Sequence, residues 1–472
     1  MGENKRERYI VAFEIGSSKI RGAIGVVDNI GVVDVIAVEE ERLLDKVRYG
    51  CIQNVDVSNA LATVAERLQA YPRVEPRKIT GAYVSLGGRT LVSRLEDVAL
   101  TLPAETEITR PIINDLCQQA AATVSGERDV VEVVPVRFTV DNKVQTNPVG
   151  SYGRSLGARM TVLSCAPQIK RMLRRVITER LGLSINGYVT RVLAEAAITL
   201  TDDERRLGCM FVDFGAETTS VAIYKNGAPV YVATLPIGSR NITLDLTALN
   251  QIEERAEEIK KVSGNAMAQD TLRRKPVSDG IDYTEVNNYV HSRADEIVAN
   301  IRAQVEYAGL RDTDLPGGIV IVGGGARLRG FNELLSQQTN MKVRQGAPTA
   351  SVRITDGSID RAEMVDVISI LAAAAGMPET ECLTPAVVQD SGREEDGHDS
   401  YESRYGEGNV TERGSRIGRL DDEDDDEGDE EEREPAGRRG QPQKSRGAFS
   451  SLFTSLKEGI ARMVDDNTEF KD

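Results

Sequence analysis

The sequence has no tryptophan and few aromatic residues of any kind, and this scarcity limits what the protein can bind. Aromatic residues make up 4% of the 472 positions. Ligands held mainly by stacking on rings, such as sugars and exposed nucleobases, are therefore poor candidates. Histidine is also scarce, because only His291 and His398 occur, and neither has metal ligands near it in the sequence. We expect neither a zinc site nor a Ser-His-Asp triad.

Paired cysteines and long apolar runs are missing too. The five cysteines form no Cys-x-x-Cys pair and are scattered at Cys51, Cys117, Cys165, Cys209 and Cys382. Such spacing is typical of reduced thiols in a cytosolic protein. No run of 18 apolar residues exists, so we expect no transmembrane helix. The first eight residues lack the apolar core of a signal peptide.

Negative charge is concentrated near one end of the chain. The net charge is −16, and residues 390–446 hold 20 acidic and 10 basic side chains with almost no large apolar residues. This segment cannot bury enough surface to offset its ordering entropy, so we predict a disordered linker over 383–446 that acts as a solubilising spacer. The acidic balance argues against nucleic acid as a partner.

Apolar runs alternate with helical patterns between residues 9 and 382. Strands are predicted at 9–13, 19–27, 82–86, 131–140, 160–164, 210–213, 219–224, 230–235 and 319–322. Helices are predicted at 56–70, 110–124, 167–181, 241–248, 253–263, 284–309, 330–337 and 364–375. Thr109 is the expected cap of the second helix, with Pro111 in its first turn. This alternation predicts an α/β protein.

A second helical pattern follows the predicted linker, over residues 447–464. Its seven apolar residues share one helical face, and they are Phe449, Leu452, Phe453, Leu456, Ile460, Met463 and Val464. Basic residues just before it attract anionic lipid, which favours adsorption of this amphipathic helix to a membrane. Docking on the chain's own body, or on a partner protein, is the alternative.

One pattern occurs twice, over residues 9–24 and 209–224. Each copy has an apolar strand, an acidic residue, a spacer, a glycine, small polar residues and a second strand. Each copy predicts a β-hairpin with a polar tip. Glycine permits close backbone approach, and successive N–H groups in such a turn form an anion site. The hydroxyls that can add donors to phosphate are those of Ser17, Ser18, Thr218 and Thr219.

Charged residues of the hairpins extend this interpretation. Lys19 can place a positive charge on a phosphate, whereas Glu14 and Asp213 would repel it. We therefore predict that these two acids hold Mg²⁺ through water. A third glycine cluster, Gly323, Gly324 and Gly325, follows the strand predicted at 319–322. It fits neither a Walker A loop nor GxGxxG. Each motif alone is consistent with a plain turn, and the three together indicate a nucleotide site.

This constellation resembles the actin, Hsp70 and sugar-kinase superfamily, and within it the FtsA family of bacterial cell-division actin homologues. The segments that carry the resemblance are 13–20, 147–150, 193–194, 200–208, 256–260 and 318–325, with the tail and terminal helix. The resemblance implies an actin-like two-lobed ATPase fold with an FtsA-type inserted subdomain. The implied divisions are 8–85 with 161–200 for the first lobe, 86–160 for the insert, 201–230 with 305–382 for the second lobe, and 231–304 for a small subdomain.

The resemblance also implies a ligand, ATP with Mg²⁺, and roles for particular residues. The phosphate contacts would be Gly16, Ser17, Ser18 and Lys19, with Gly215, Thr218 and Thr219. Gly323, Gly324 and Gly325 would meet the adenosine. Glu257 and Lys260 would flank the base or ribose, and their spacing does put them on one helix face. Without the resemblance, that pair is equally well an ordinary solvated salt bridge.

The function implied by the resemblance is that of a membrane-tethering scaffold. The family self-assembles with nucleotide bound, and the C-terminal tail of the tubulin homologue FtsZ would bind at 231–304. Other division proteins would meet the insert at 86–160, and the terminal helix would hold anionic lipid. The implied location is the cytoplasmic face of the cell membrane at the division site, as a peripheral protein.

Two residues, Arg191 and Glu217, depart from the pattern of active relatives. Arg191 stands where relatives that hydrolyse ATP well place Glu or Gln to orient water, and arginine cannot act as a base. Glu195, one turn later, is a possible substitute, although a helix-surface carboxylate is the simpler interpretation. Glu217 lies in the second hairpin, where it is unfavourable near phosphate unless Mg²⁺ or Lys19 compensates. We therefore predict at most a weak ATPase.

Two other functions compete with the scaffold. A phosphotransferase of the sugar-kinase kind would need an acceptor pocket with a catalytic Asp and would have no use for a tethered helix. A pilus-assembly actin homologue would typically lack the tail and helix. An Hsp70-like chaperone is disfavoured because no substrate-binding β-domain follows residue 382.

Overall fold

The computed structural model describes residues 8–43, 46–124, 126–267, 281–349, 352–354 and 359–385. Almost all of the predicted acidic linker and the whole predicted helix 447–464 lie outside these ranges, so both remain predictions. None of the described helices combines the length and the apolar character needed to cross a bilayer.

The first lobe is built on a six-stranded sheet in the order β11-β6-β1-β2-β3-β17. Its strands are β1 (Arg8–Ile15), β2 (Lys19–Val27), β3 (Val33–Arg42), β6 (Gly81–Leu86), β11 (Ser184–Thr190) and β17 (Val352–Ile354). The first three strands are antiparallel neighbours, β6 pairs parallel with β1, and β11 pairs parallel with β6.

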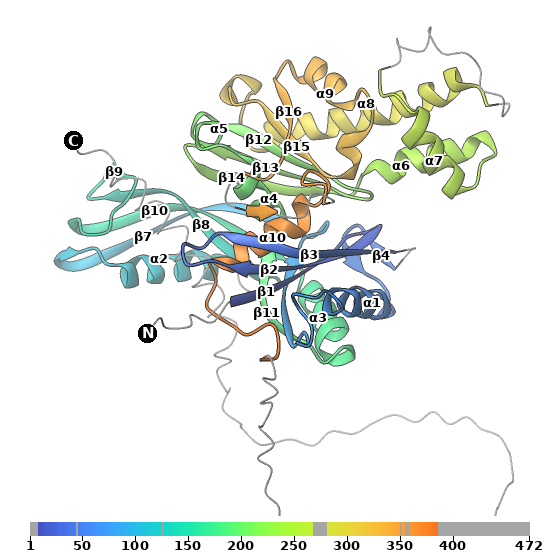
Figure 1. The fold of residues 1–472 in the computed structure, drawn as a ribbon. Coiled ribbons are helices and arrows are strands. Elements are labelled where there is room, and N and C mark those ends of the chain that lie inside the picture. Colours follow the sequence, from blue (N-terminus) through green and yellow to red (C-terminus); the bar gives the residue numbers. More distant parts are fainter. Residues whose placement is uncertain are drawn as a thin grey trace, which may run out of the picture. The chain divides into compact units, whose positions relative to one another are not determined.

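The second lobe repeats this arrangement (Figure 1). Its strands are β12 (Cys209–Phe214), β13 (Thr219–Lys225), β14 (Ala228–Leu235), β15 (Ile319–Val322) and β16 (Val343–Gln345). Again three strands run antiparallel, and two more pair parallel on the other side of the first strand. The hairpin repeat seen in the sequence is therefore part of a repeat of the whole sheet.

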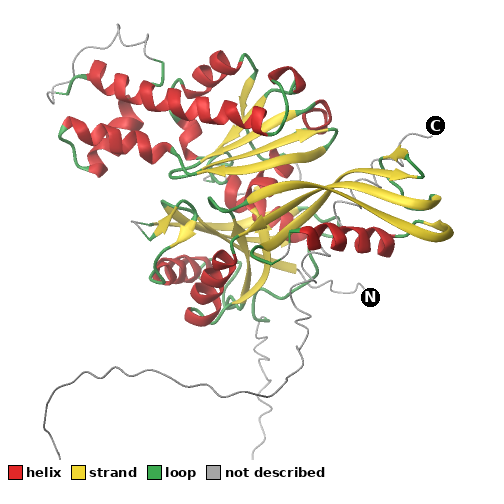
Figure 2. Ribbon diagram, turned by 180° about the vertical axis from the view of Figure 1, so that it is seen from behind, coloured by secondary structure: helices red, strands yellow, loops and turns green. Residues whose placement is uncertain are grey.

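An insert extends the second sheet beyond β14. Its strands, in spatial order, are β7 (Val92–Glu107), β10 (Tyr152–Cys165), β8 (Asp129–Val140) and β9 (Lys143–Gln145). Helix α2 (Arg110–Thr123) covers one face of these strands (Figure 2). The ladder joins the insert to the lobe at Ala233 and Val92, so the two form one nine-stranded sheet.

Helices fill both faces of the first sheet. Gly22 of β2 faces Val64 and Leu68 of α1, whereas Gly25 faces Leu371 of α10. Residues three apart on a strand point to opposite faces, so α1 and α10 cover opposite sides. Gly22 makes room for α1, since an added Cβ would lie 2.6 Å from Val64, whereas a Cβ on Gly25 would crowd Val33 of the neighbouring strand β3 at 2.7 Å.

The remaining helices complete three apolar cores. Their bounds are α1 (Val57–Gln69), α3 (Pro167–Arg174), α4 (Arg191–Thr199), α5 (Asp202–Leu207), α6 (Ser239–Leu246), α7 (Glu253–Ser263), α8 (Tyr283–Tyr307), α9 (Phe331–Thr339) and α10 (Val365–Ala375). One core lies around the first sheet, one joins the second sheet to α6–α9, and one lies under α2 in the insert. Helix α4 contacts strands of both sheets, which places its first residue between the lobes.

Most predicted elements are present, and the strands that were missed have weak patterns. Strands at 19–27 and 319–322 and the helix at 253–263 have the predicted bounds. Strand β7 was missed because its apolar alternation is confined to Val98, Leu100 and Leu102, and most of its other side chains are polar or exposed. The sequence also missed β3, which ends in four charged residues, and the strands β11, β16 and β17.

The helix predicted at 167–181 is present, although its second part is π-helical, whereas the predicted side-chain cap of α2 is not formed. The single helix predicted at 167–181 is α3 followed by a π-helical segment, Arg175–Arg180. Thr109 is at the cap position of α2, but its side chain makes no cap hydrogen bond. Pro111 does lie in the first turn, as predicted.

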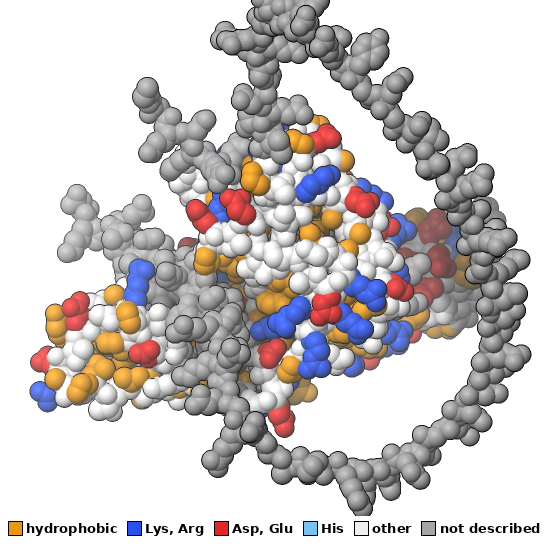
Figure 3. All heavy atoms as spheres, turned by 90° about the horizontal axis from the view of Figure 1, so that it is seen from below, with side chains coloured by type: hydrophobic (Ala, Val, Ile, Leu, Met, Phe, Trp, Pro, Cys, Tyr) orange, Lys and Arg blue, Asp and Glu red, His pale blue; other side chains and the backbone are white. Residues whose placement is uncertain are grey.

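The described surface carries charges of both signs. Lys and Arg side chains gather near the middle of the face in Figure 3, with Asp and Glu side chains scattered around them. The segment formed by α3 and the π-helical turn contributes four exposed arginines, Arg171, Arg174, Arg175 and Arg180. This segment is therefore a local concentration of positive charge on the described surface.

Candidate functional site

The two hairpins have the same geometry. In the first, Glu14 pairs with Arg21 across the strands, and Ile15 with Ile20. In the second, Asp213 pairs with Ser220, and Phe214 with Thr219. Both loops therefore contain four residues, 16–19 and 215–218. The predicted phosphate residues lie in these loops or, for Thr219, at the first position of the next strand.

The loop glycines are needed because a side chain would not fit, and not because the backbone adopts a special conformation. Gly16 N–H donates to the Lys19 carbonyl and Gly215 N–H to the Thr218 carbonyl, each at 2.9 Å. Neither glycine has a positive φ. An added Cβ would lie 3.0 Å from the carbonyl oxygen that each glycine binds. A side chain would push this tight turn open, which explains glycine at both positions.

Arg191, at the first position of α4, joins the two hairpins. Its Nη1 donates to Glu14 Oε1 at 2.6 Å, and its Nη2 donates to Asp213 Oδ2 at 2.8 Å. The acids occupy equivalent positions, one residue before the end of β1 and of β12. Arg191, which stands where active relatives have Glu or Gln, is therefore the residue that bridges the two hairpin acids.

Burial raises the pKa values of the acids in this cluster. Glu14 is 2% exposed and Asp213 is 5% exposed. Burial raises the pKa of Glu14 to about 7, against the opposing effect of Arg191. Burial also raises the pKa of Asp213 above its usual range, and Arg191 again opposes the change. The guanidinium thus offsets only part of the cost of removing two carboxylates from water.

Glu195 is a third acid of the cluster, and the prediction of a helix-surface position for it was wrong. It is 1% exposed, and its Oε1 lies 3.8 Å from Arg191 Nε. Its Oε2 has no hydrogen-bond partner in the part of the chain that the structure describes. Burial first, and then the charge of Asp213, raise the pKa of Glu195 well above its usual range. Burial therefore favours the protonated form of Glu195.

The cluster does not fit Mg²⁺ as the sequence predicted. The oxygens of Glu14 and Asp213 that would hold the ion's waters accept hydrogen bonds from Arg191 instead. Within the described ranges, no group of three or more His, Cys, Asp and Glu side chains is arranged to hold a metal ion. The positive charge that Glu14 and Asp213 bind is the guanidinium of Arg191.

Lys19 has two acidic partners close to the first hairpin. Its Nζ lies 2.7 Å from Glu40 and 3.5 Å from Glu363. Arg21 shares both partners and also binds Asp366 of α10 at 2.6 Å. The lysine predicted to meet phosphate is therefore part of an acid-rich network, and it would have to be shared with any phosphate.

The tip of the second hairpin contacts the first lobe. Glu217 Oε2 accepts from the backbone N–H of Tyr49 at 2.7 Å, and its Oε1 pairs with Arg240 at 2.8 Å. Arg240 is the second residue of α6 and also pairs with Glu253. The charge of Glu217 is thus balanced by Arg240, and not by Mg²⁺ or Lys19 as the sequence suggested.

The third glycine segment packs against the second hairpin. Gly323 has φ +91°, and an added Cβ would lie 2.5 Å from the Phe214 carbonyl. A Cβ on Gly325 would lie 2.6 Å from the Phe214 ring, which stacks on Phe331. Gly324 differs, because a Cβ there would meet nothing within 4 Å. Two of the three glycines are therefore explained by packing, and Gly324 is the one with room for a ligand.

Glu257 and Lys260 form a salt bridge on α7, with 2.6 Å between Oε2 and Nζ. Lys260 is 6% exposed, so the pair is not the solvated bridge that the sequence left open. Its ammonium also donates to the Ser239 carbonyl and to Thr243 Oγ1 of α6. Burial lowers the pKa of Lys260, against the opposing effect of Glu257. The pair ties α7 to α6 beside Arg240.

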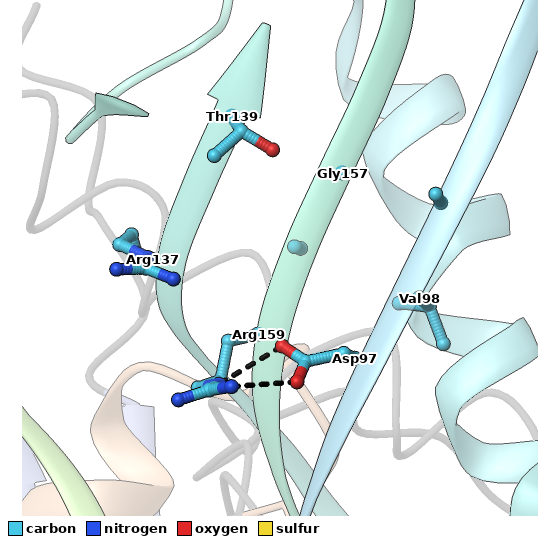
Figure 4. A pocket seen from close by; sticks show the side chains of 8 residues that line it. Asp97, Val98, Arg137, Thr139, Gly157 and Arg159 are labelled. Atoms are coloured by element: carbon cyan, nitrogen blue, oxygen red, sulfur yellow. Dashed lines mark hydrogen bonds and ion pairs between the residues drawn. The ribbon is translucent and has the colours of Figure 1, made fainter. Parts of the chain in front are cut away.

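A pocket of about 240 Å³ lies elsewhere, on the insert (Figure 4). Its lining comes from β7, β8 and β10, and includes Asp97, Arg137 and Arg159. Arg159 faces Asp97 and binds it with two hydrogen bonds, at 2.9 and 2.7 Å. This pair is exposed and contributes little to stability. None of the predicted site residues lines the pocket.

Comparison with known proteins gives the family. A model for "Cell division protein FtsA" matches residues 210–369, and one for "SHS2 domain inserted in FTSA" matches 88–164. The cell division protein FtsA of Porphyromonas gingivalis is 30% identical over 419 residues, covering 85% of this chain and 86% of that protein. The chain belongs to the FtsA family. The Pseudomonas aeruginosa FtsA is 27% identical over 363 residues, covering 74% of this chain and 85% of that one.

A solved structure supports the fold of this FtsA-family chain. The PilM-PilN type IV pilus biogenesis complex matches with a TM-score of 0.57 and 14% identity, covering 78% of this chain and 98% of that one. At this identity the likeness concerns the fold alone. The predicted fold class, an actin-like α/β fold with an FtsA-type insert, is confirmed, and the family is that of cell-division proteins.

Sequence reasoning missed the residues that surround the hairpins in this FtsA-family chain. They are Arg21, Glu40, Arg240, Glu363 and Asp366. One of them left a signal: Arg21 is a lone charge inside the apolar strand β2, and a buried charge needs an internal partner. The others lie far along the chain from the hairpins, and the residues around them give no indication of these ion pairs.

Proposed function

We propose that this FtsA-family chain binds ATP with the two hairpin loops and the segment around Gly324. The observation that carries the proposal is the equivalent geometry of the two loops, whose acids meet on one arginine. Turns with successive free N–H groups bind phosphate, and Gly324 has open space for a nucleoside. The assignments of Gly16, Ser17, Ser18, Lys19, Gly215, Thr218 and Thr219 belong to this proposal.

Substitution at Gly324 tests ATP binding by calorimetry on the full chain. Gly324→Val adds volume where a Cβ meets nothing within 4 Å, so the fold should persist while ATP affinity falls at least about ten-fold, or 1.4 kcal/mol. Ala99→Val adds similar volume at an exposed position of β7 and should leave affinity unchanged. Wild-type affinity in Gly324→Val would contradict the site.

Hydrolysis is expected to be slow or absent. Arg191 cannot act as a base, and Glu195 is buried, which favours its protonated form. The nucleotide would then be a ligand that favours assembly of the chain into filaments. A steady-state ATPase rate above about 1 s⁻¹, the low end for enzymes, would contradict this part of the proposal.

We further propose that the small subdomain binds the C-terminal tail of FtsZ, over the predicted range 231–304. Among its described residues, the large apolar side chains that are exposed include Leu244, Ile252 and Val262. Ile252→Glu should weaken binding of an FtsZ-tail peptide at least about ten-fold. Val144→Glu changes an equally exposed residue of the insert and should not. Equal effects of both substitutions would place the peptide elsewhere.

Membrane attachment through residues 447–464 completes the proposed scaffold, which would hold FtsZ filaments at the cytoplasmic face of the membrane and meet other division proteins through 86–160. Co-sedimentation with anionic liposomes tests the attachment. Phe453→Glu interrupts the apolar face and should abolish binding, whereas Ser455→Glu changes the polar face and should reduce it only modestly. Unchanged binding after removal of 447–472 would rule out this anchor.

A further inference from the structure

The Arg191 guanidinium lies between Glu14 and Asp213, the two acids that the sequence predicted to hold Mg²⁺. Glu14 and Asp213 come from equivalent positions of two hairpins, and each gives one carboxylate oxygen to the same guanidinium. Mg²⁺ needs about six oxygen ligands at roughly 2.0–2.1 Å and keeps several waters. The same oxygens cannot serve a guanidinium at hydrogen-bond distance and a hydrated ion at once.

The surroundings of the two acids also leave little room for the waters of such an ion. Glu14 and Asp213 are each at least 95% buried. Glu195 adds a third carboxyl group next to Arg191. Removing the guanidinium would take from Glu14 and Asp213 the hydrogen-bond donor that they share, so Arg191 is part of the folded arrangement.

Arg191 has hydrogen-bonding capacity left for a ligand. A guanidinium carries five N–H groups in a planar fork that suits phosphate as well as carboxylate. Two of them donate to Glu14 and Asp213. Its Nε also lies 3.8 Å from Glu195 Oε1, and the side chain keeps 15% of its surface exposed.

We propose that the Arg191 guanidinium replaces the divalent cation in this chain, so that the site binds the polyphosphate of a nucleotide independently of Mg²⁺. This inference rests on the nucleotide binding proposed above. It differs from the pattern of a metal–nucleotide complex, because the counter-charge is a side chain that is always present. The hairpin acids then serve to position Arg191.

Calorimetric titration of the full chain with ATP, in excess Mg²⁺ or in excess EDTA, tests the proposal. The wild-type dissociation constants should agree within about three-fold, a difference under 1 kcal/mol. Arg191→Gln frees the two carboxylates, so ATP affinity in that variant should fall at least about ten-fold when Mg²⁺ is removed. Arg159→Gln breaks an arginine–carboxylate pair on the insert and should behave as wild type.

Each other outcome overturns a defined part of the proposal. Wild-type binding that requires Mg²⁺ overturns the inference and leaves ATP binding intact. Binding that ignores Mg²⁺ in both wild type and a folded Arg191→Gln overturns the assignment to Arg191. Absence of ATP binding in either buffer overturns the proposed function as well. If Arg191→Gln does not fold, the wild-type comparison still decides whether Mg²⁺ is needed.

Discussion

Arg191, Glu14, Asp213 and Glu195 form a buried group with one positive charge and three acids. Charges of this kind are costly to bury unless each finds a partner. Arg191 donates to Glu14 and Asp213 directly, and burial raises the pKa of Glu195, which favours its neutral form. The state of Glu195 can be tested without any ligand.

Glu195→Gln should make the protein's stability less dependent on pH. The pKa of Glu195 lies well above 4.5 in the folded protein, so folding holds a proton that the unfolded chain releases. Its contribution is therefore complete below about pH 4.5 and is lost as pH rises. Glutamine does not ionise, so the melting temperature of the variant, relative to wild type, should be higher at pH 8 than at pH 5.

Glu66→Gln is the control for this pH dependence, because Glu66 is exposed on α1. Its melting temperature relative to wild type should be the same at both pH values. A Glu195→Gln variant that shifts equally at both pH values would show that Glu195 is ionised in the folded protein.

The glycine segment after β15 supports a second test at this scale. Gly325→Ala should destabilise the protein by about 1–3 kcal/mol through overpacking, because its Cβ would lie 2.6 Å from Phe214. Gly324→Ala should change the free energy of unfolding by less than about 0.5 kcal/mol, as expected where nothing crowds the new atom. Urea denaturation of both variants measures the difference. Equal losses would mean that Gly324 is also packed.

At the scale of elements, the threonines that precede helices α5 and α2 look alike in the sequence, but only one of them caps its helix. Thr201 caps α5 with a complete capping box, in which it and Glu204 each accept from the other's backbone N–H. Glu204 also binds Arg344 of β16 at 2.6 Å. Thr109 precedes α2 in the same way but makes no cap bond. A threonine before a helix therefore predicts where the helix begins, and not that the cap forms.

Thr201→Ala should cost about 1 kcal/mol of stability, the usual value for a lost cap. Thr109→Ala should cost less than about 0.5 kcal/mol, because no cap bond is lost. Chemical denaturation of the two variants, measured side by side, checks the contrast. A larger loss for Thr109→Ala would mean that its hydroxyl caps α2 in solution.

The whole molecule depends on junctions between segments distant in sequence. The insert joins the second lobe where Ser93 Oγ accepts from Val232 N–H at 2.7 Å and donates to the Val232 carbonyl at 3.1 Å. One hydroxyl thus replaces two ladder bonds between β7 and β14. The nine-stranded sheet is continuous because these groups are satisfied.

Ser93→Ala should weaken this junction by about 1–3 kcal/mol, because both Val232 backbone groups lose their partner. Hydrogen exchange should show faster exchange of the Val232 amide, with little change in the first sheet. Ser93→Thr keeps a hydroxyl and should retain most of the protection. Unchanged exchange in Ser93→Ala would mean that the ladder itself holds the insert in place.

Local patterns account for what the sequence predicted well. The hairpins, the glycine segment and most helices depend on residues within about 16 positions of one another, and turn chemistry and helical periodicity act over that range. The match of β2 and β15 to their predicted bounds reflects this. Strand β7 was missed because its alternating apolar residues, Val98, Leu100 and Leu102, form only a short run among polar and exposed positions.

The sequence by itself determined the α/β class, the repeated hairpin and the likeness to FtsA, because those follow from neighbouring residues and their spacing. Only the tertiary structure decided what Arg191 does. It lies 177 residues from Glu14 and 22 from Asp213, and no local rule pairs them. Folding of two similar sheets brings both acids to one guanidinium and buries Glu195 beside it, because buried charges must find a partner wherever the fold places one.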